Sequence, residues 1–190
     1  MKILMLGNSL TTAHDLPELL GKLTGADIAV HARGGARLAE HLNPSTRLGT
    51  LTQQALAVGT WDYVVLQEMS NGPVRFCEKF LDACARLAAA IRASGAEPLL
   101  YATWAYAPDC SKLEKLGMSH EQMNEQLSSA YHAAAEQNGA LIATVGDAFF
   151  AHPSKAALYA PDGVHPSPAG TQLAAQTLAA AIQAGRSHHA

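Results

Sequence analysis

The chain begins with MKILMLGNSL, residues 1–10, and this stretch organises the rest of the fold. Residues 2–6 form a short apolar run that predicts a strand. The polar turn Gly7-Asn8-Ser9-Leu10 follows at once, and a helical pattern begins soon afterwards. Ligands bind at the carboxyl ends of the strands in open α/β sheets, so the turn places the Ser9 hydroxyl at the mouth of a candidate site.

Five apolar segments alternate with helical segments along the chain. The segment 61–67 contains the run Val64-Val65-Leu66, which is typical of a strand buried on both faces. The predicted strands are residues 2–6, 27–32, 61–67, 97–103 and 140–145. This alternation predicts a parallel sheet with helices on both faces. The flavodoxin-like strand order 2-1-3-4-5 is our expectation for it.

Helices are predicted where apolar residues recur at three- and four-residue spacing. These segments are residues 14–23, 47–58, 76–93, 119–137 and 168–184, with shorter pieces at 37–41 and 147–152. Residues 104–119 form the longest stretch without such a pattern. Its aromatic residues and Pro108 predict a lid or pocket wall that decides specificity.

Length and composition predict one globular domain over residues 1–190, because 48% of the residues are hydrophobic and 15% are charged. A net charge of -3 without clustered Lys or Arg argues against a nucleic-acid partner. No stretch approaches the roughly 18 consecutive apolar residues of a membrane span. The apolar run after Lys2 is too short for an export signal. We therefore expect a cytoplasmic protein without a membrane partner, and its oligomeric state stays open.

The loops contain the parts of a serine-nucleophile site. Ser9 would be the nucleophile, and a serine hydroxyl needs an adjacent base. His165 can be that base, because imidazole titrates near neutral pH. Asp162, three residues earlier, would orient His165 and stabilise its charged form. Gly163 permits the tight turn that brings both side chains to one place.

Neutral hydrogen-bond donors follow the other strands and could stabilise an oxyanion. The backbone N–H of Ser9 is one donor, and the N–H of Gly34 or Gly35 is another. A side-chain amide could be the third, from either Gln67 or Asn71. Gln67 is slightly preferred, because it lies closer to the end of its strand.

The order of these motifs resembles the SGNH hydrolases, also called GDSL-type esterases. That family has Gly-Asp-Ser in its first block, Gly in the second, Gly-x-Asn-Asp in the third and Asp-x-x-His in the fifth. The matching residues are Gly7-Asn8-Ser9-Leu10, Gly34 or Gly35, and Asp162-Gly163-Val164-His165. The resemblance covers nearly the whole chain. It implies a three-layer α/β/α fold, ester or amide hydrolysis through Ser9, His165 and Asp162, and an oxyanion N–H from the second-block glycine.

Two positions depart from the family pattern. Asn8 replaces the usual Asp, which keeps a side-chain acceptor but removes the charge. The third block reads LQEMSN at residues 66–71, so its oxyanion donor is open. Glu68 in this block is expected to be a salt-bridged or solvated carboxylate without a catalytic role. We assign substrate contacts to Asn8, Trp104 and Tyr106.

The leading hypothesis is a serine hydrolase that cleaves small acyl esters, such as O-acetyl groups on carbohydrate, without a cofactor or metal. The lack of a long apolar lid favours small acyl groups. A metal-assisted hydrolase with Asp162, His165 and His152 as ligands is a weaker alternative, because no zinc-binding spacing is present. A non-catalytic module that binds a carbohydrate or an acylated ligand is the third alternative. The altered third block is its best support.

Overall fold

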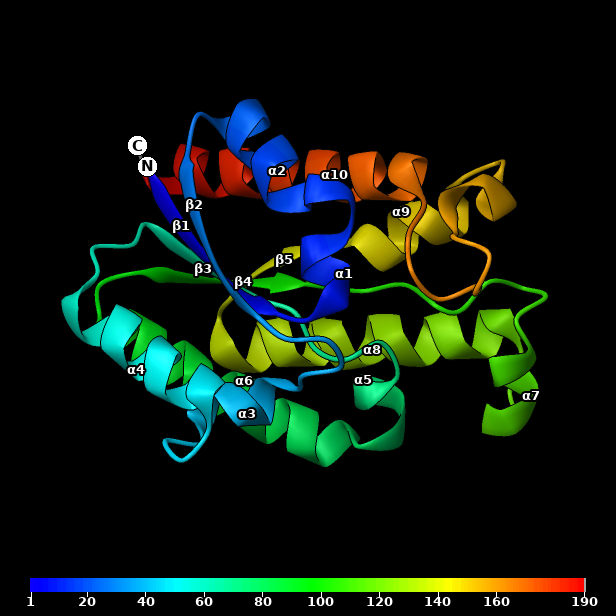
Figure 1. Ribbon diagram of the computed structural model, residues 1–190, viewed down its shortest axis with the longest axis horizontal. Coiled ribbons are helices and arrows are strands. Elements are labelled where there is room, and N and C mark those ends of the chain that lie inside the picture. The colour runs from blue at the N-terminus through cyan, green and yellow to red at the C-terminus, as the bar shows by residue number, and fades with distance from the viewer. Residues whose placement is uncertain (190) are drawn as a thin grey trace.

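A five-stranded parallel sheet in the order β2-β1-β3-β4-β5 forms the centre of the molecule (Figure 1). The structure is a computed structural model that describes residues 1–189. The strands are β1 (Lys2–Gly7), β2 (Asp27–Ala32), β3 (Tyr63–Leu66), β4 (Glu97–Tyr101) and β5 (Leu141–Ala143). Each strand overlaps its predicted segment, and the predicted order 2-1-3-4-5 is confirmed.

Helices cover both faces of this sheet, as the alternating pattern predicts. On one face lie α2 (Leu16–Thr24), α9 (Val145–Ala151) and α10 (Pro168–His189), shown at the top of Figure 1. On the other face lie α3 (Leu38–Leu42), α4 (Arg47–Val58), α6 (Cys77–Ala93) and α8 (His120–Asn138). The three-layer α/β/α arrangement is therefore confirmed. None of the helices in residues 1–189 combines the length and the apolar character needed to cross a membrane.

The sheet register aligns apolar side chains in rows through the core. One row consists of Val30, Met5, Val65, Leu99 and Leu141, from one edge strand to the other. The three central side chains are fully buried, because helices cover both faces above and below them. Burying a side chain of this size stabilises the fold by about 1.5–3 kcal/mol.

The same register brings three strand ends together at one edge of the sheet. Gly7 at the end of β1 pairs with Ala32 at the end of β2. Leu6 pairs with Leu66, the last residue of β3. The turns that follow these three strands therefore begin side by side, at the edge where open α/β sheets bind ligands.

The first helix begins earlier than predicted. α1 (Ser9–Thr12) starts directly after Asn8, whose side chain caps it by accepting a hydrogen bond from the N–H of Leu10. A 3-10 turn at Ala13–Asp15 then separates α1 from α2. The apolar spacing over 14–23 predicted only the longer second helix, since a single turn gives no periodic pattern.

Residues 104–119, which were predicted to be an irregular lid or pocket wall, contain a buried segment and a short helix. Residues 104–107 are buried beyond the end of β4, and α7 (Ser111–Leu116) follows them. Two further short elements were not predicted, α5 (Gly72–Arg75) and a 3-10 turn at Lys155–Leu158. Each is too short to show a helical repeat in the sequence.

His41 in α3 is a buried histidine that joins two helices of one layer. Its Nδ1 lies 2.9 Å from the hydroxyl of Thr52 in α4, and its Nε2 has no partner among the described residues. Burial, helped by the nearby charge of His31, lowers the pKa of His41 to about 4. The unfolded chain takes up a proton near pH 6.5, whereas the folded chain does not. Stability is therefore lost as the pH falls from about 6.5 towards 4.

We expect His41→Gln to flatten this acid loss of stability. In the unsubstituted protein, His41 alone lowers the free energy of unfolding by about 2 kcal/mol between pH 8 and pH 5. Urea unfolding of both proteins at both pH values measures the difference. The same pH dependence in the two proteins would show that His41 is not the group responsible.

Candidate active site

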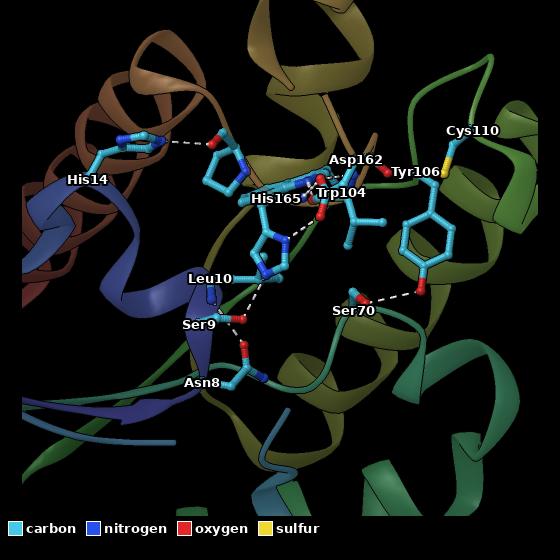
Figure 2. Close-up of polar contacts among 12 residues, drawn as sticks. Asn8, Ser9, Leu10, His14, Ser70, Trp104, Tyr106, Cys110, Asp162 and His165 are labelled. Atoms are coloured by element: carbon cyan, nitrogen blue, oxygen red, sulfur yellow. Dashed lines mark hydrogen bonds and ion pairs between the residues drawn. The ribbon is translucent and has the colours of Figure 1, made fainter. Parts of the chain in front are cut away.

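Three side chains from the two ends of the chain form a line of hydrogen bonds (Figure 2). Ser9 Oγ, at the start of α1, lies 2.9 Å from His165 Nε2. His165 Nδ1 lies 2.6 Å from Asp162 Oδ2. The side chains of His165 and Asp162 are 43% and 42% exposed, so the line opens to solvent. The structure thus brings together the three residues that the sequence assigned to catalysis.

The environment of Asp162 determines the tautomer of His165. Partial burial acts to raise the pKa of Asp162, but hydrogen bonds from the His165 ring and from the N–H groups of Val164 and His165 outweigh it and lower the pKa to about 2. Asp162 is therefore a carboxylate and can only accept at neutral pH. The proton between the two side chains belongs to Nδ1, so Nε2 is free to accept the Ser9 hydroxyl proton.

The loop of residues 162–166, which contains Asp162 and His165, is held in place by hydrogen bonds to its backbone carbonyls. Each of the five consecutive carbonyl oxygens accepts a hydrogen bond. The donors, in chain order of the acceptors, are Cys110 Sγ, the Ala107 N–H, Trp104 Nε1, the Ala160 N–H and His14 Nε2. Three of these donors come from residues 104–110, so this segment supports the loop and does not act as a lid.

Gly163 is required at the tightest point of this loop. Its φ of +68° lies in the left-handed region that favours glycine. A Cβ at this position would lie 2.9 Å from the Cβ of Cys110, which is too close. The close approach allows the carbonyl of Gly163 to reach the Ala107 N–H at 2.8 Å.

Trp104 is buried and does not face a substrate. Its indole ring stacks on Phe149 with 4.2 Å between ring centroids, and its Nε1–H donates to the carbonyl of Val164 at 3.0 Å. Only 1% of the residue is exposed. We therefore reassign Trp104 from substrate binding to support of the loop that contains His165.

A buried amide holds the turn that contains Ser9. Gln67 Oε1 accepts from the N–H of Asn8 at 2.9 Å and from the hydroxyl of Thr11 at 2.8 Å. Its Nε2 donates to the carbonyl of Glu68, and the residue is fully buried, so its amide is not open to a ligand. Gly7 makes this approach feasible, because a Cβ there would lie 2.7 Å from Gln67 Oε1. We therefore reassign Gln67 from oxyanion donor to support of the Ser9 turn.

Asn8 joins the turn after β1 to the turn after β2. Its Nδ2 donates to the carbonyl of Ala36 at 2.9 Å, and its Oδ1 accepts from the N–H of Leu10. The residue is only 2% exposed. Both ends of the amide are needed by the backbone, so Asn8 positions Ser9 and is not placed to contact a substrate.

Glu68 joins the turn after β3 to the start of α3, which follows β2. Its carboxylate accepts from the N–H of Leu38, at the start of α3, at 3.2 Å and from the N–H of Met69 at 2.7 Å. Burial raises the pKa of Glu68, against the opposing effect of these N–H groups. The expectation of a salt-bridged or solvated carboxylate is wrong, because the group is buried and serves as a cap for α3.

Four candidate oxyanion donors remain free at this edge of the sheet. Among the described residues, the N–H groups of Ser9, Gly34 and Gly35 have no hydrogen-bond acceptor. Asn71, at the start of α5, also makes no side-chain hydrogen bond there, and its Oδ1 is buried without a partner. An amide that the fold leaves unused is unusual, and it is therefore a candidate for a ligand contact.

Tyr106 and Ser70 form a pair of hydroxyls on the neighbouring loops. Tyr106 OH lies 3.1 Å from Ser70 Oγ. In Figure 2 this pair lies across from Ser9 and His165. Burial is the main cause that raises the pKa of Tyr106, so its hydroxyl stays neutral and can donate. Tyr106 is 5% exposed, so little of the residue is open to solvent.

Most of the ligand atoms that a metal would need already make hydrogen bonds. His165 uses both ring nitrogens, and both carboxylate oxygens of Asp162 accept hydrogen bonds. His152 Nδ1 accepts from the N–H of Ser154. Within residues 1–189, no group of three or more His, Cys, Asp or Glu side chains is arranged to hold a metal ion. The geometry therefore gives no support to the metal-assisted alternative.

Comparison with known protein families shows which family this chain belongs to. The model of the GDSL-like lipase/acylhydrolase family matches residues 5–173, which include both ends of the Ser9–His165–Asp162 line.

This chain belongs to the GDSL-like lipase/acylhydrolase family.

The protein is thus an SGNH-type esterase or acylhydrolase, as the motif order predicted. A search of curated protein sequences finds no significant match.

Solved structures agree with this family. A protein from Slackia heliotrinireducens assigned to the SGNH hydrolases is 54% identical, with a TM-score of 0.93, and the match covers 96% of this chain and 98% of that one. A DUF4886 family protein from Bacteroides uniformis is 22% identical, with a TM-score of 0.76 and coverage of 96% and 82%. An acetylxylan esterase from Geobacillus stearothermophilus is 15% identical, with a TM-score of 0.69 and coverage of 95% and 93%. The last two show likeness of fold.

Trp104→Phe is expected to loosen the 162–166 loop. Phenylalanine keeps a ring against Phe149 but leaves the carbonyl of Val164 without its donor, which costs about 1–3 kcal/mol of unfolding free energy. Amide hydrogen exchange at Val164 and His165 is expected to become faster. Denaturant unfolding and exchange rates measured by NMR test both effects.

Trp61→Phe is the matched control. Trp61 Nε1 donates to the carbonyl of Ala55 at 2.8 Å, next to the opposite end of the sheet. This variant should leave exchange at Val164 and His165 unchanged apart from any global loss of stability. Equal acceleration in the two variants would contradict a specific role for Trp104 in holding the loop.

Proposed function

We propose that this SGNH hydrolase cleaves acyl esters with Ser9 as nucleophile, His165 as general base and acid, and Asp162 as the residue that orients His165. The line of hydrogen bonds from Ser9 Oγ through His165 to Asp162, at 2.9 and 2.6 Å, is the observation that carries this proposal. It supplies the nucleophile, the neighbouring base and the orienting group that a serine mechanism needs.

In the first step, Ser9 Oγ attacks the ester carbonyl carbon as its proton moves to His165 Nε2. The carboxylate of Asp162 stabilises the imidazolium without taking the proton, which its low pKa permits. The leaving alcohol then takes the proton from Nε2, and an acyl-enzyme ester remains on Ser9. A water molecule, activated by His165 in the same way, hydrolyses that ester and restores Ser9.

The oxyanion of the tetrahedral intermediate would be bound by N–H groups that the fold leaves free. These are the backbone N–H of Ser9, the N–H of Gly34 or Gly35, and the Nδ2–H of Asn71, whose side chain does not cap α5. Asn8 and Glu68 hold the three turns together, which supports a fixed position for these donors. Preorganised donors of this kind can each contribute about 3 kcal/mol to catalysis.

Esters of small acyl groups are the proposed substrates. An O-acetylated carbohydrate is the candidate, and its hydroxyl would be the leaving alcohol. Residues 104–107 and Cys110 are buried and support the 162–166 loop, so they offer no apolar lid for a long chain. The hydroxyls of Tyr106 and Ser70 suit a polar substrate better than a fatty acyl chain. The acetylxylan esterase from Geobacillus stearothermophilus shows that this fold accommodates such chemistry in another protein.

Ser9→Ala is expected to abolish hydrolysis of p-nitrophenyl acetate, with a loss of at least about 10³ in kcat, because no nucleophile remains. The unsubstituted protein should hydrolyse the acetate faster than the butyrate and the octanoate. A fluorophosphonate probe should label Ser9, as mapped by mass spectrometry. Retained turnover in Ser9→Ala would exclude Ser9 as nucleophile, and a preference for octanoate would exclude the small-acyl proposal.

Asn71→Ala is expected to lower kcat for p-nitrophenyl acetate by about 10²–10³, since it removes one oxyanion donor. Its melting temperature should stay close to that of the unsubstituted protein, because the fold does not use this amide. Gln67→Ala should instead lower the melting temperature, because it removes buried hydrogen bonds to Asn8 and Thr11. An active Asn71→Ala protein would rule out Asn71 as the third donor.

A further inference from the structure

The turn between α1 and α2 has an unusual backbone conformation. His14 and Asp15 have φ values of 45° and 56°, and they are the only non-glycine residues with positive φ in residues 1–189. Residues with a Cβ rarely adopt this conformation, because the Cβ approaches the following carbonyl oxygen. Such strain persists only where the surroundings hold it, and it gathers at functional sites. This turn lies five residues after Ser9, so its position invites a functional explanation.

Only one of the two strained residues has a side-chain partner. His14 Nε2 lies 3.1 Å from the carbonyl oxygen of Pro166. A carbonyl can only accept, so Nε2 carries the proton in this bond. Asp15 is exposed, and its carboxylate makes no hydrogen bond in the described part of the chain, not even as a cap for α2.

The bond from His14 joins the same two segments as the bond from Ser9. Both start in the segment that opens with α1, and both end on the loop that contains His165 (Figure 2). Among the described residues they are the only two hydrogen bonds between residues 9–15 and residues 162–166. The other donors to this loop come from residues 104–110 and Ala160.

We propose that His14 is a positioning residue for catalysis. Its bond to the carbonyl of Pro166 fixes the distance between Ser9 Oγ and His165 Nε2, and the left-handed turn holds its side chain in the direction that makes the bond. The inference rests on the proposed catalytic roles of Ser9 and His165. Its effect should fall on kcat, because a displaced base slows proton transfer without changing substrate contacts.

A purely structural explanation of the strain makes a different prediction. The turn could serve only to direct α2, where Leu16 is fully buried. In that case the backbone shape of both residues would matter, and the side chain of His14 would not. Asp15→Gly is therefore the matched control, since it relieves positive-φ strain next to His14 and leaves the His14–Pro166 bond in place.

The experiment compares His14→Gly, Asp15→Gly and Ser9→Ala with the unsubstituted protein, using p-nitrophenyl acetate kinetics and thermal unfolding. Both glycine variants should melt close to the temperature of the unsubstituted protein, because relief of the positive-φ strain offsets the added entropy of the unfolded chain. His14→Gly should lose about tenfold in kcat with an unchanged KM. Asp15→Gly should keep its kcat. Should His14→Gly fail to fold, His14→Asn also tolerates positive φ, is too short to reach Pro166, and should show the same loss.

The outcomes separate this inference from the proposed function. Full kcat in His14→Gly together with an inactive Ser9→Ala would overturn the role of His14 alone. Equal loss of kcat in His14→Gly and Asp15→Gly would also overturn it, since the backbone turn would then be responsible. An active Ser9→Ala protein would overturn the proposed catalytic line, and the role of His14 with it.

Discussion

The two hydrogen bonds that Gln67 Oε1 accepts, from the N–H of Asn8 and the hydroxyl of Thr11, are the constraint on which the site depends. They join the turn after β1 to the turn after β3 inside the protein, where water cannot compete for them. Asn8 also donates to the carbonyl of Ala36 in the turn after β2, and the carboxylate of Glu68 accepts from the N–H of Leu38 at the start of α3. Three separate loops thereby become one rigid support for Ser9.

A second rigid unit holds the base. The 162–166 loop has every carbonyl occupied, mainly by donors from residues 104–110, and Trp104 is locked in place by its stacking on Phe149. The unit with Ser9 comes from the first half of the chain and the unit with His165 from the second. The bonds from Ser9 and His14 to the 162–166 loop cross between them, and so does the bond between Ser70 and Tyr106. Precise geometry at the site therefore follows from two preformed halves and a short contact between them.

Most of the fold could be predicted from the sequence, because buried strands and amphipathic helices have distinct periods. The strand order and the meeting of Ser9 with His165 follow from that pattern and from the family motifs. The direction of polar side chains could not be predicted. A polar residue after a buried strand, such as Gln67 or Asn8, can turn towards the ligand or back into the protein, and only the three-dimensional packing decides. Trp104 was misjudged for the same reason, since an aromatic residue in an irregular stretch has no period to indicate its partner.

The fully occupied carbonyls of the 162–166 loop also bear on how this enzyme can change during evolution. Their donors are mostly backbone N–H groups and buried side chains, so they depend on the path of the chain more than on the exposed side chains of the loop. Substitutions at exposed positions leave these hydrogen bonds intact, whereas inserting or deleting one residue would move the carbonyls beyond that point away from their donors. We therefore expect this protein to tolerate changes of length in other loops better than in the loop that holds its base.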